Sequence, residues 1–477
     1  QFWTSGQSSW ADFDNDGDPD LLTSTYLYSW GPESTILYIN NGGDSFTKVD
    51  LETEGRSTNP VWVDFDRDGH LDIFLPYLDQ NYGRFYRNNR DHTFTAGEQI
   101  PKASGFTSFG DYDNDEDDDL LSFNSNGVVF YVNNGDGTFT EASNVLPNIG
   151  WMTPNGASWG DFNNDGHLDI FVTCGTHYDC TNTLYINNGK GNFYIASPSM
   201  IEYSGGQSYG SAWQDFDNDG YLDLVVANFQ GVNFLYRNQG NGTFERILRG
   251  AIPEEYGAPE YEKSSSMGCA WGDYNRDGFV DLVIFNNNGM KSFLYANQGN
   301  ENNWISLSLI GEVSNRSAIG ATVKIKVNDT WQTRLVTPQS GFAGQNSLDV
   351  EFGLGTATTV DRVEIKWPSG IQQTLVNVRA NQFLTIVESE DVTAVDRHLT
   401  AMHPYPNPAS NYVMIRGIDS FSKMNAFVTD MTGVVRDVVE FSNPDGLLID
   451  IEPLPPGPYI LSLSDGTRVQ RWKLIRK

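Results

Sequence analysis

Six short acidic runs recur along this chain at intervals of about fifty residues, and each one follows an aromatic residue. Side-chain oxygens stand at positions 1, 3, 5 and 9 of every run. The residues at these positions are Asp12, Asp14, Asp16 and Asp20; Asp64, Asp66, Asp68 and Asp72; Asp111, Asp113, Asp115 and Asp119; Asp161, Asn163, Asp165 and Asp169; Asp215, Asp217, Asp219 and Asp223; and Asp273, Asn275, Asp277 and Asp281. Hard cations such as Ca²⁺ bind six to eight oxygen ligands at about 2.3–2.6 Å. The spacing therefore predicts calcium loops, with about five to six bound ions, one per loop.

The backbone of each run is expected to complete the ligand set. Position 7 offers a carbonyl oxygen, from Asp18, His70, Asp117, His167, Tyr221 or Phe279. Glycine at position 6 allows the positive φ that folds the ligands inward. The third run has Glu116 at that position, and a non-glycine residue is strained there. We expect this loop to bind calcium less tightly or with an altered geometry.

Grouped carboxylates are unfavourable without a cation. Two like charges about 4 Å apart repel by roughly 4 kcal/mol at an effective dielectric of 20, so a metal-free loop would open or raise its pKa values. A solvated acidic turn would explain one such run, but the repetition in register argues against it. An EF-hand needs a bidentate Glu at position 12. These runs have Thr23, Leu75, Ser122, Val172, Val226 and Ile284 there.

Apolar segments on both sides of the loops predict β-strands. A segment such as SSWADF leads into the loop, LLTSTY follows it, and a turn then separates ILYINN from GDSFTKV. Asn-Gly, Asp-Gly and Gly-Asn pairs are typical of hairpin turns. Four short strands in a unit of about 40–50 residues indicate a β-propeller blade. The fold class is therefore all-β with six countable blades, and the start of the chain near the first loop leaves open a leader and part of a seventh blade upstream.

This region, residues 1–301, resembles the FG-GAP repeats of integrin α-subunits in their VCBS-type bacterial form. The resemblance rests on the six acidic loops and the strands around them. It implies an integrin-like propeller held together by calcium, and it implies no particular ligand.

Composition narrows the possible functions. The net charge of −32 argues against nucleic acid, which is bound by basic surfaces. No apolar run reaches the roughly 18 residues of a transmembrane helix. No signal peptide is visible, although Gln1 would suit a mature terminus after cleavage.

Cys174 and Cys180 flank a hairpin tip and their pairing stays open, whereas Cys269 is expected to be buried. Weak calcium modules need about millimolar free calcium, which places the protein outside the cell.

Residues 302–388 continue the strand pattern without the period. WISLSLIG, ATVKIKV, WQTRLVT, DRVEIKW and FLTIVE are expected strands, separated by turns at SNRSAIGA, PQSGFAGQ, FGLGTA and WPSG. The segments SNRSAIGA at 314–321, FGLG at 352–355 and WPSG at 367–370 resemble the ASPIC/UnbV module. That module commonly follows such propellers, and its role is not implied by the resemblance.

Residues 389–403 are expected to be a linker, and residues 404–477 a small Ig-like β-sandwich of five strands. The opening PYPNPAS, the turn near Asp430, the LPPGPY segment and the basic end resemble the type A C-terminal sorting domain of the Bacteroidota type IX secretion system. The resemblance implies export, with the translocon and an outer-membrane shuttle barrel as partners. An Ig-like adhesive domain is the simpler alternative.

No catalytic motif stands out. There is no Gly-x-Ser-x-Gly elbow, His-Glu-x-x-His or phosphate loop, so we expect no enzyme. Inter-blade segments offer aromatic residues that would suit a sugar or protein surface or would pack between blades. They are Tyr26, Tyr28, Trp30, Tyr77, Tyr82, Trp151, Tyr178, Tyr203, Tyr256 and Tyr261.

Three functional hypotheses follow. The leading one is a secreted or surface-attached calcium-dependent adhesion scaffold for an unknown glycan, matrix or surface-protein ligand. The alternatives are an extracellular enzyme or accessory subunit that acts on polysaccharide, with a carboxylate pair assembled across blades, and a subunit of a larger outer-membrane assembly.

Overall fold

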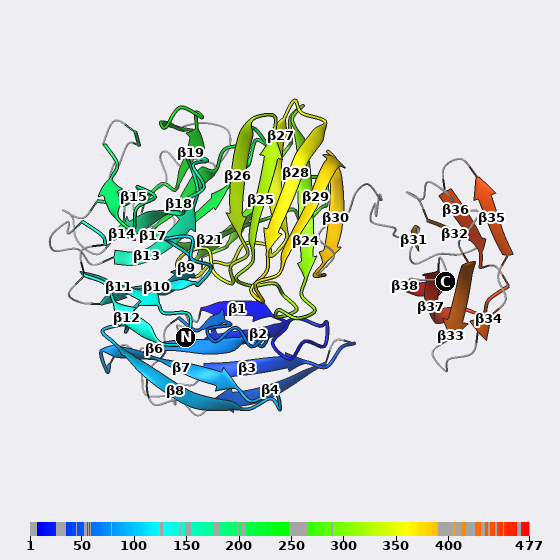
Figure 1. Cartoon of the computed structure of the whole chain (residues 1–477), viewed down its shortest axis with the longest axis horizontal. Helices are drawn as coiled ribbons and strands as arrows, with labels where there is room; N and C mark the ends of the chain where they lie inside the picture. The colour runs from blue at the N-terminus through cyan, green and yellow to red at the C-terminus, as the bar shows by residue number, and fades with distance from the viewer. Residues whose placement is uncertain are drawn as a thin grey trace. The chain divides into compact units, whose positions relative to one another are not determined.

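The computed structural model describes 7–24, 35–43, 45–51, 55, 57, 59–77, 79–124, 127–143, 145–147, 154–175, 181–197, 200–201, 207–229, 231–247, 265–287, 290–389, 404–405, 412–415, 425–430, 435–436, 439–443, 446–451, 453–464 and 469–476. The chain divides into two compact units, residues 1–381 with 386–394 and residues 382–385 with 395–477. Within the described ranges every helix or strand element is a β-strand, so the fold is all-β as predicted (Figure 1).

The acidic repeats form six antiparallel sheets, here called blades 1 to 6, and each sheet keeps its strands in chain order. Blade 1 contains β1 (Ser8–Ala11), β2 (Asp20–Ser24), β3 (Thr35–Asn40) and β4 (Phe46–Leu51); blade 2 contains β5 (Val61–Val63), β6 (Asp72–Tyr77), β7 (Tyr82–Asn88) and β8 (Phe94–Pro101); blade 3 contains β9 (Thr107–Gly110), β10 (Asp119–Asn124), β11 (Gly127–Asn133) and β12 (Phe139–Glu141). Blade 4 contains β13 (Pro154–Gly160), β14 (Asp169–Cys174), β15 (Thr183–Asn187) and β16 (Phe193–Ile195); blade 5 contains β17 (Gln207–Gln214), β18 (Asp223–Phe229), β19 (Phe234–Asn238) and β20 (Phe244–Arg246); blade 6 contains β21 (Ser266–Gly272), β22 (Asp281–Asn286) and β23 (Phe293–Tyr295).

The same register recurs in all six blades. The aromatic residue two positions ahead of the loop always pairs with the residue that follows the position-9 aspartate, as Trp10 pairs with Leu21. The prediction of four strands per unit is confirmed for blades 1 to 5. It is wrong for blade 6, whose described sheet has three strands. The chain leaves blade 6 after β23 and enters the next domain at β24 (Asn303–Ile310).

Hydrophobic cores lie between adjacent blades. One cluster joins Phe171 and Leu184 of blade 4 to Trp213 and Leu224 of blade 5. Similar clusters join blades 2 and 3, 3 and 4, and 5 and 6. Figure 1 shows the sheets in a propeller-like arrangement, with blades 1 and 2 in blue at the lower side of the first unit and β24–β30 in yellow-green to orange at its upper right.

Residues 303–387 form two further sheets. Their strands are β24, β25 (Thr322–Val327), β26 (Thr330–Leu335), β27 (Val350–Gly355), β28 (Thr359–Lys366), β29 (Gln372–Arg379) and β30 (Gln382–Val387). The sheet orders are β27-β24-β30 and β26-β25-β28-β29. FGLG lies inside β27, so its assignment as a turn was wrong. The strand β29 was not predicted, because its QQTLVNVR sequence mixes polar and apolar residues without a clean alternation.

A segment of this domain, residues 338–347, lies among the inner strands of the propeller and is called the plug segment below. Ser9 Oγ of blade 1 donates to Pro338 O at 2.9 Å. Gln339 Nε2 donates to Asn59 Oδ1, just ahead of β5, at 2.7 Å. One segment thus contacts the inner side of blades 1 and 2.

The other end of the plug segment contacts blades 5 and 6. Trp271 N donates to Asn346 Oδ1 at 3.0 Å, and Asn346 Nδ2 donates to Trp213 O at 3.2 Å. A Cβ atom on Gly344 would lie 2.1 Å from Cys269 O, so this close approach requires glycine. The plug segment therefore links blades 1 and 2 to blades 5 and 6 on the inner side of the ring.

The second unit contains two four-stranded antiparallel sheets, β31-β32-β36-β35 and β34-β33-β37-β38. The strands are β31 (Pro404–Tyr405), β32 (Tyr412–Ile415), β33 (Asn425–Asp430), β34 (Val435–Arg436), β35 (Val439–Asn443), β36 (Gly446–Asp450), β37 (Gly457–Ser464) and β38 (Val469–Arg476). Val413 and Ile449 of the first sheet and Val428 and Leu461 of the second are fully buried. The prediction of five strands captured the longer ones and missed the short additional strands.

Candidate metal centres

Each acidic run forms the loop between the first and second strands of its blade, and the loops are numbered like the blades. The position-1 aspartate accepts two backbone hydrogen bonds in all six loops. In loop 1, Asp16 N donates to Asp12 Oδ1 at 3.0 Å and Gly17 N donates to Asp12 Oδ2 at 2.8 Å. The equivalent acceptors are Asp64, Asp111, Asp161, Asp215 and Asp273. Both oxygens of position 1 therefore help to fold the loop.

The position-5 aspartate fixes the peptide at position 7. Asp18 N donates to Asp16 Oδ1 at 2.9 Å. The same bond joins His70 to Asp68, Asp117 to Asp115, His167 to Asp165, Tyr221 to Asp219 and Phe279 to Asp277. The carbonyl that the sequence predicts as a ligand belongs to a residue held in place by its own loop.

The position-9 aspartate accepts a hydrogen bond from an asparagine that ends the third strand in blades 1 to 5 and lies two residues after it in blade 6. Asn40 N donates to Asp20 Oδ1 at 2.8 Å, and Asn88, Asn133, Asn187, Asn238 and Asn297 donate to their own position-9 aspartates in the same way. Four of these side chains also reach the preceding blade, as when Asn238 Nδ2 donates to Phe162 O at 2.8 Å. Sequence analysis missed this role, although the asparagine repeated in ILYINN, TLYINN and FLYRNQ was the available signal.

Sequence analysis also missed the role of the residue at loop position 4. The φ angles of Asn15, Arg67, Asn114, Asn164, Asn218 and Arg276 lie between 55° and 62°, a region that asparagine tolerates better than most residues. Each of the four asparagines donates through Nδ2 to the position-6 carbonyl of the next loop, at 2.9–3.2 Å. In loop 2, Arg67 Nη2 instead contacts Asp117 Oδ1 of loop 3 at 2.7 Å. Neighbouring loops are therefore joined from loop 1 through to loop 6.

The predicted positive φ at position 6 is confirmed. It ranges from 82° at Gly69 to 98° at Gly220 among the five glycines. Glu116 keeps this conformation, with φ of 83°, so the strain predicted for loop 3 is present. Its side chain contacts Lys366 Nζ of the next domain at 3.0 Å.

Burial makes ionised carboxylates costly in these loops. It is the largest cause that raises the pKa of Asp12 to about 6 and the pKa of Asp20 to about 7. Burial likewise raises the pKa of Asp72 to about 8 and the pKa of Asp119 to about 9. In loop 5, burial and then repulsion from Asp215 raise the pKa of Asp223 well above its ordinary value. A bound cation would remove this penalty by favouring the charged form.

The donor set fits a hard cation. Carboxylate oxygens lie within 4.8 Å of one another in four loops, in the groups Asp12, Asp14 and Asp20; Asp64, Asp66 and Asp72; Asp111, Asp113 and Asp115; and Asp215, Asp217 and Asp223. Buried oxygens without a hydrogen-bond partner include Asp66 Oδ1, Asp72 Oδ2, Asp169 Oδ2 and Asp217 Oδ1. Buried polar atoms are normally satisfied, so these oxygens suit metal ligation. In loops 4 and 6 the amide oxygens of Asn163 and Asn275 accept the position-5 N–H.

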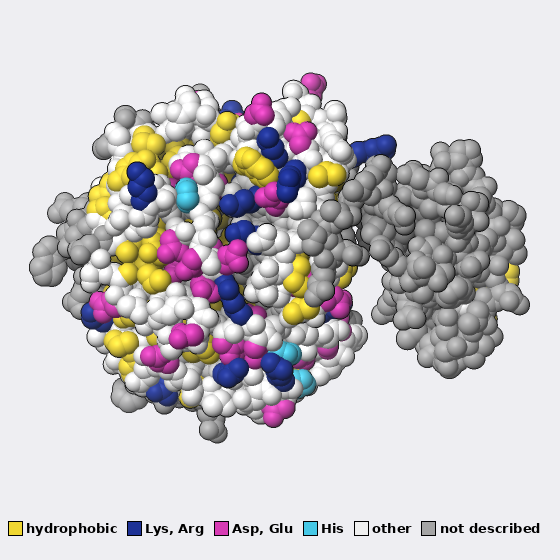
Figure 2. All heavy atoms as spheres, viewed as in Figure 1, with side chains coloured by type: hydrophobic (Ala, Val, Ile, Leu, Met, Phe, Trp, Pro, Cys, Tyr) yellow, Lys and Arg dark blue, Asp and Glu magenta, His cyan; other side chains and the backbone are white. Residues whose placement is uncertain are grey.

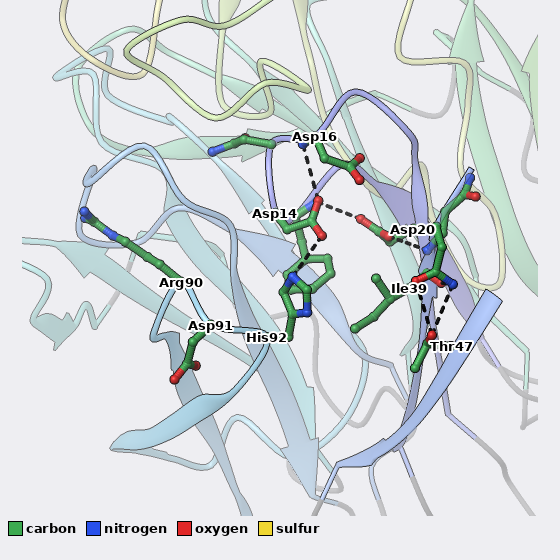
Figure 3. Close-up of polar contacts among 12 residues, drawn as sticks. Asp14, Asp16, Asp20, Ile39, Thr47, Arg90, Asp91 and His92 are labelled. Atoms are coloured by element: carbon green, nitrogen blue, oxygen red, sulfur yellow. Dashed lines mark hydrogen bonds and ion pairs between the residues drawn. The ribbon is translucent and has the colours of Figure 1, made fainter. Parts of the chain in front are cut away.

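Basic side chains offset part of the charge in several loops. Arg87 Nη2 lies 2.6 Å from Asp66 Oδ2, and Arg237 Nε lies 2.8 Å from Asp217 Oδ2. Figure 3 shows loop 1, where His92 of the β7–β8 hairpin approaches Asp14, with Nε2 3.3 Å from Oδ2.

The domain of residues 303–387 covers the loops. At loop 1, Asp12 N donates to Ser317 Oγ at 2.9 Å and Arg316 N donates to Asn15 Oδ1 at 2.8 Å. At loop 5, Gly355 N donates to Asn218 O at 2.9 Å. At loop 6, a Cβ on Gly278 would lie 1.7 Å from the Trp304 ring, so the indole packs directly on this glycine. Figure 2 shows acidic and basic side chains mixed across the face of the first unit turned to the viewer.

One buried arginine of this domain lies between loops 4 and 5. Arg334 donates to Thr333 O at 3.0 Å, and its guanidinium lies 5.1 Å from the centre of the Phe352 ring. Burial lowers the pKa of Arg334, while the carboxylates of Asp215 and then Asp161 oppose that shift. An arginine stays charged in proteins, so this residue brings a fixed positive charge to two acidic loops.

A buried carboxylate organises the segment that contacts loop 1. Glu388 Oε2 accepts the N–H groups of residues 312–314, each at 2.8 Å. Glu388 Oε1 accepts Ser314 Oγ at 2.8 Å and Ser369 Oγ at 2.5 Å. The SNRS and WPSG segments are thus held together beside the propeller, and FGLG contacts loop 5. The sequence segments on which the resemblance to the ASPIC/UnbV module rests are therefore the segments that hold this domain against the propeller.

Other sequence expectations had mixed outcomes. Tyr77, for which the sequence left open a binding surface or packing between blades, is fully buried, and its hydroxyl lies 2.6 Å from that of Tyr86. Tyr82 is half-buried. The remaining aromatic candidates, Tyr26, Tyr28, Trp30, Trp151, Tyr178, Tyr203, Tyr256 and Tyr261, lie outside the described residues. Cys269 is free and buried as expected. Cys174 is disulfide-bonded, and Cys180 lies outside the described residues.

Comparison with family models agrees with this organisation. The FG-GAP-like repeat matches residues 12–75, 111–172, 161–226 and 215–284. The family model described as ASPIC and UnbV matches residues 311–393, and the model of the secretion system C-terminal sorting domain matches residues 403–477. The chain is therefore an FG-GAP-repeat protein with an ASPIC/UnbV domain and a C-terminal sorting domain. That last domain marks it for type IX export to the cell surface or beyond.

Among curated proteins, the chain is similar to cartilage acidic protein 1. It is 27% identical to the Homo sapiens protein over 303 residues, which cover 57% of this chain and 42% of the relative. It is 26% identical to the Mus musculus protein over 329 residues, which cover 63% and 48% respectively. The chain thus spans less than half the length of these relatives.

Among solved structures, a lectin of Agrocybe aegerita that recognises non-reducing terminal N-acetylglucosamine matches with a TM-score of 0.43 and 19% identity. The match covers 62% of this chain and 82% of the lectin. Within the part of the chain that the structure describes, no helix is long and apolar enough to cross a membrane.

Proposed function

We propose that the protein is an exported calcium-binding scaffold that holds a glycan, a matrix polymer or another surface protein. Calcium acts structurally, with one ion in each loop. The observation that carries the proposal is the set of buried carboxylate oxygens without hydrogen-bond partners in loops 2, 4 and 5, of which loop 5 also contacts the ASPIC/UnbV domain. Calcium bound there would stabilise each loop and, through it, the docked domain.

The loop carboxylates support a structural role over catalysis. Each position-1 aspartate accepts two backbone N–H groups, and position 9 accepts the N–H of a third-strand asparagine. Carboxylates immobilised in this way are poorly placed to transfer protons to a substrate. We therefore infer that the protein binds its ligand without turning it over.

Calcium binding can be tested on the full chain. Titration calorimetry of chelator-treated protein should show about five to six Ca²⁺ per chain, with loop 3 the weakest, because Glu116 is strained. A matched variant pair is Asp64→Asn, which changes a loop ligand, and Asp50→Asn, which changes an exposed aspartate of β4. The Asp64→Asn variant should bind about one Ca²⁺ fewer per chain. The Asp50→Asn variant should bind as many Ca²⁺ ions as the unchanged protein. Heat of binding that is absent, or equally reduced by both variants, would contradict the proposal.

Ligand binding needs a separate test. The exported protein should be applied to a glycan array and, in parallel, incubated with the same glycans while the products are analysed. Retention without cleavage supports a binding scaffold, whereas cleavage would favour the polysaccharide-acting enzyme. Loss of export on removal of residues 404–477 would test the role of the sorting domain in recognition by the translocon and shuttle barrel.

A further inference from the structure

A cavity of about 80 Å³ lies between the propeller and the domain of residues 303–387. Its walls include β13 and β17 of blades 4 and 5, the strand β26 and part of the plug segment, all within the first compact unit. Among the described residues, no loop carboxylate lines it. A cavity of this size has room for about five to eight water molecules or for part of a small ligand. It is therefore a candidate binding site apart from the metal centres.

Several buried polar atoms of this lining have no hydrogen-bond partner within the described residues, among them Arg334 Nε, Gln339 Oε1 and Ser340 Oγ. Arg334 and Ser340 are only 8% and 6% exposed. The other two nitrogens of the guanidinium donate to Thr333 O at 3.0 Å and to Gln332 Oε1 at 3.4 Å, which fixes its orientation. Buried polar atoms are normally satisfied. The lining therefore offers a fixed donor, an acceptor and a hydroxyl that can do either.

The same cavity has an aromatic wall. Trp159 Nε1 donates to Ser108 Oγ at 3.1 Å, and Trp213 Nε1 donates to Ser158 O at 3.3 Å. Because both N–H groups are used within the propeller, each indole has only ring carbons to offer to the cavity. Small-molecule sites typically combine apolar and aromatic walls with a few polar groups that fix the orientation of the ligand.

The carboxyl group of Glu351 also belongs to the lining. Its Oε2 accepts a hydrogen bond from Gln214 Nε2 at 3.0 Å. Burial, and then repulsion from Asp349, raise the pKa of Glu351 well above its ordinary value, so its neutral form is favoured. The positive charge of Arg334 is already opposed by the carboxylates of loops 4 and 5. Neither group therefore requires a ligand of the opposite charge.

We propose that this cavity binds one neutral sugar ring, as the terminal residue of a glycan chain. One ring hydroxyl would accept from Arg334 Nε, a second would donate to Gln339 Oε1, and a third would bond to Ser340 Oγ. An apolar face of the ring would lie against the tryptophan wall. This inference rests on the proposed scaffold function and narrows its ligand to a glycan.

Charged ligands match the lining less well than a neutral one. A carboxylate or phosphate beside Arg334 would also meet Glu351 and Asp349, and an ammonium group would meet the guanidinium of Arg334. Burying a charge without a dedicated partner is costly. Sugar hydroxyls both donate and accept, so they can pair with the mixed set of lining atoms without adding charge.

The test uses the calcium-loaded full chain and a panel of methyl glycosides. The panel contains the neutral glucoside, galactoside, mannoside and xyloside and the anionic glucuronide, and binding is measured by saturation-transfer NMR and titration calorimetry. We expect at least one neutral glycoside to bind, and the glucuronide to bind more weakly than it does. If no neutral glycoside binds, or if the glucuronide binds most tightly, the proposal is wrong.

A matched pair of serine variants locates the site. Ser340→Ala removes a lining hydroxyl, and Ser24→Ala removes a similarly buried hydroxyl of blade 1 that also has no partner within the described residues. Both variants should melt within about 1–2 °C of the unchanged protein, because neither loses a hydrogen bond within the described structure. Ser340→Ala should weaken glycoside binding about 2- to 12-fold, which corresponds to one neutral hydrogen bond, and Ser24→Ala should leave it unchanged. Equal affinities in all three proteins would show that the sugar binds elsewhere.

The glycan array separates this inference from the proposed function. A retained glycan whose binding weakens in Ser340→Ala, and not in Ser24→Ala, supports both. A retained glycan that binds Ser340→Ala as tightly as the unchanged protein would overturn the cavity as the site and leave the scaffold function standing. If no glycan is retained, this inference fails, and the scaffold function is left with a protein partner as its ligand.

Discussion

Arg334 shows how a single side chain can couple the two domains of the first unit. It is buried in the ASPIC/UnbV domain, and the carboxylates of Asp215 and Asp161 in two propeller loops face its charge. A charge at this depth is tolerated only with partners of opposite sign. The arginine and the loops therefore depend on each other.

Replacing that charge should be severe. Arg334→Met is expected to lower the free energy of unfolding by about 3–5 kcal/mol, since it leaves buried carboxylates without their cation. Lys326→Met is the matched control, because its ammonium lies 3.8 Å from exposed Asp329, and such a surface pair contributes about 0–1 kcal/mol. Urea denaturation at fixed free calcium measures both. Equal losses in the two variants would show that Arg334 does not couple the domains.

Glu388 predicts a pH dependence of stability. Burial pushes its pKa upward, but hydrogen bonds from Ser369 and from the backbone of residues 312–314 outweigh burial and hold the pKa below the ordinary 4.5. A lowered pKa in the folded state means that these bonds stabilise the protein above pH 4.5 and are lost as the pH falls through the folded-state value.

Glu388→Gln should therefore destabilise the protein at pH 7 by about 1–3 kcal/mol, because the neutral amide accepts fewer of the buried N–H groups. The gap between the two proteins should narrow as the pH falls below 4.5. Melting curves of both proteins from pH 7 to pH 3.5 measure the gap. A gap that stays constant over this range would mean that the carboxylate charge contributes nothing.

The acidic loops act as a connected series. Asparagine at position 4 combines a left-handed backbone with a hydrogen bond to the next loop, as in Asn164, whose Nδ2 donates to Gly220 O at 2.9 Å. This arrangement explains why the loops tolerate an unusual φ at two positions. The free-energy cost of the strained backbone in each loop is offset by the hydrogen bonds that it makes with the neighbouring loop.

Two substitutions at Asn164 should separate these contributions. Asn164→Ala is expected to cost about 2–3 kcal/mol, because alanine is disfavoured at this φ by about 1–2 kcal/mol and the inter-loop hydrogen bond is lost. Asn164→Gly removes the bond and the strain, so it should cost only about 1 kcal/mol. Equal effects in denaturant titrations would indicate that backbone strain is irrelevant here.

Local chemistry was readable from the sequence, and contacts between repeats were not. The spacing of Asp12, Asp14 and Asp20 located the loops, and the apolar runs located their strands. The cross-blade bonds of Asn15 and Asn238 depend on how neighbouring sheets face each other, which no single repeat encodes. The plug segment was taken for a turn, because its small polar and glycine residues read locally as a loop. The structure of the docked domain shows that the plug segment needs these small residues because it closely approaches the inner strands of the propeller.

The first unit behaves as one assembly that depends on its loops. The plug segment contacts the inner strands of blades 1, 5 and 6 and Asn59 ahead of β5, and the ASPIC/UnbV domain contacts loops 1 and 5. A cation lost from one loop should therefore affect more than its own blade. Asp215 illustrates this, since its carboxylate lies against Gly353 of β27 as well as near Arg334.

Removal of calcium should loosen the docked domain together with the propeller loops. In excess EGTA, amides of the loops and of residues 338–347 are expected to exchange with deuterium roughly 10-fold faster or more, because repulsion between loop carboxylates opens the surface that holds the domain. Asp215→Ala should reproduce this change near β18 and β27. Amides of β33 and β37 in the second unit should keep their exchange rates in both experiments, since they belong to a separate compact unit. Plug-segment amides that stay protected while the loops open would show that docking is independent of calcium.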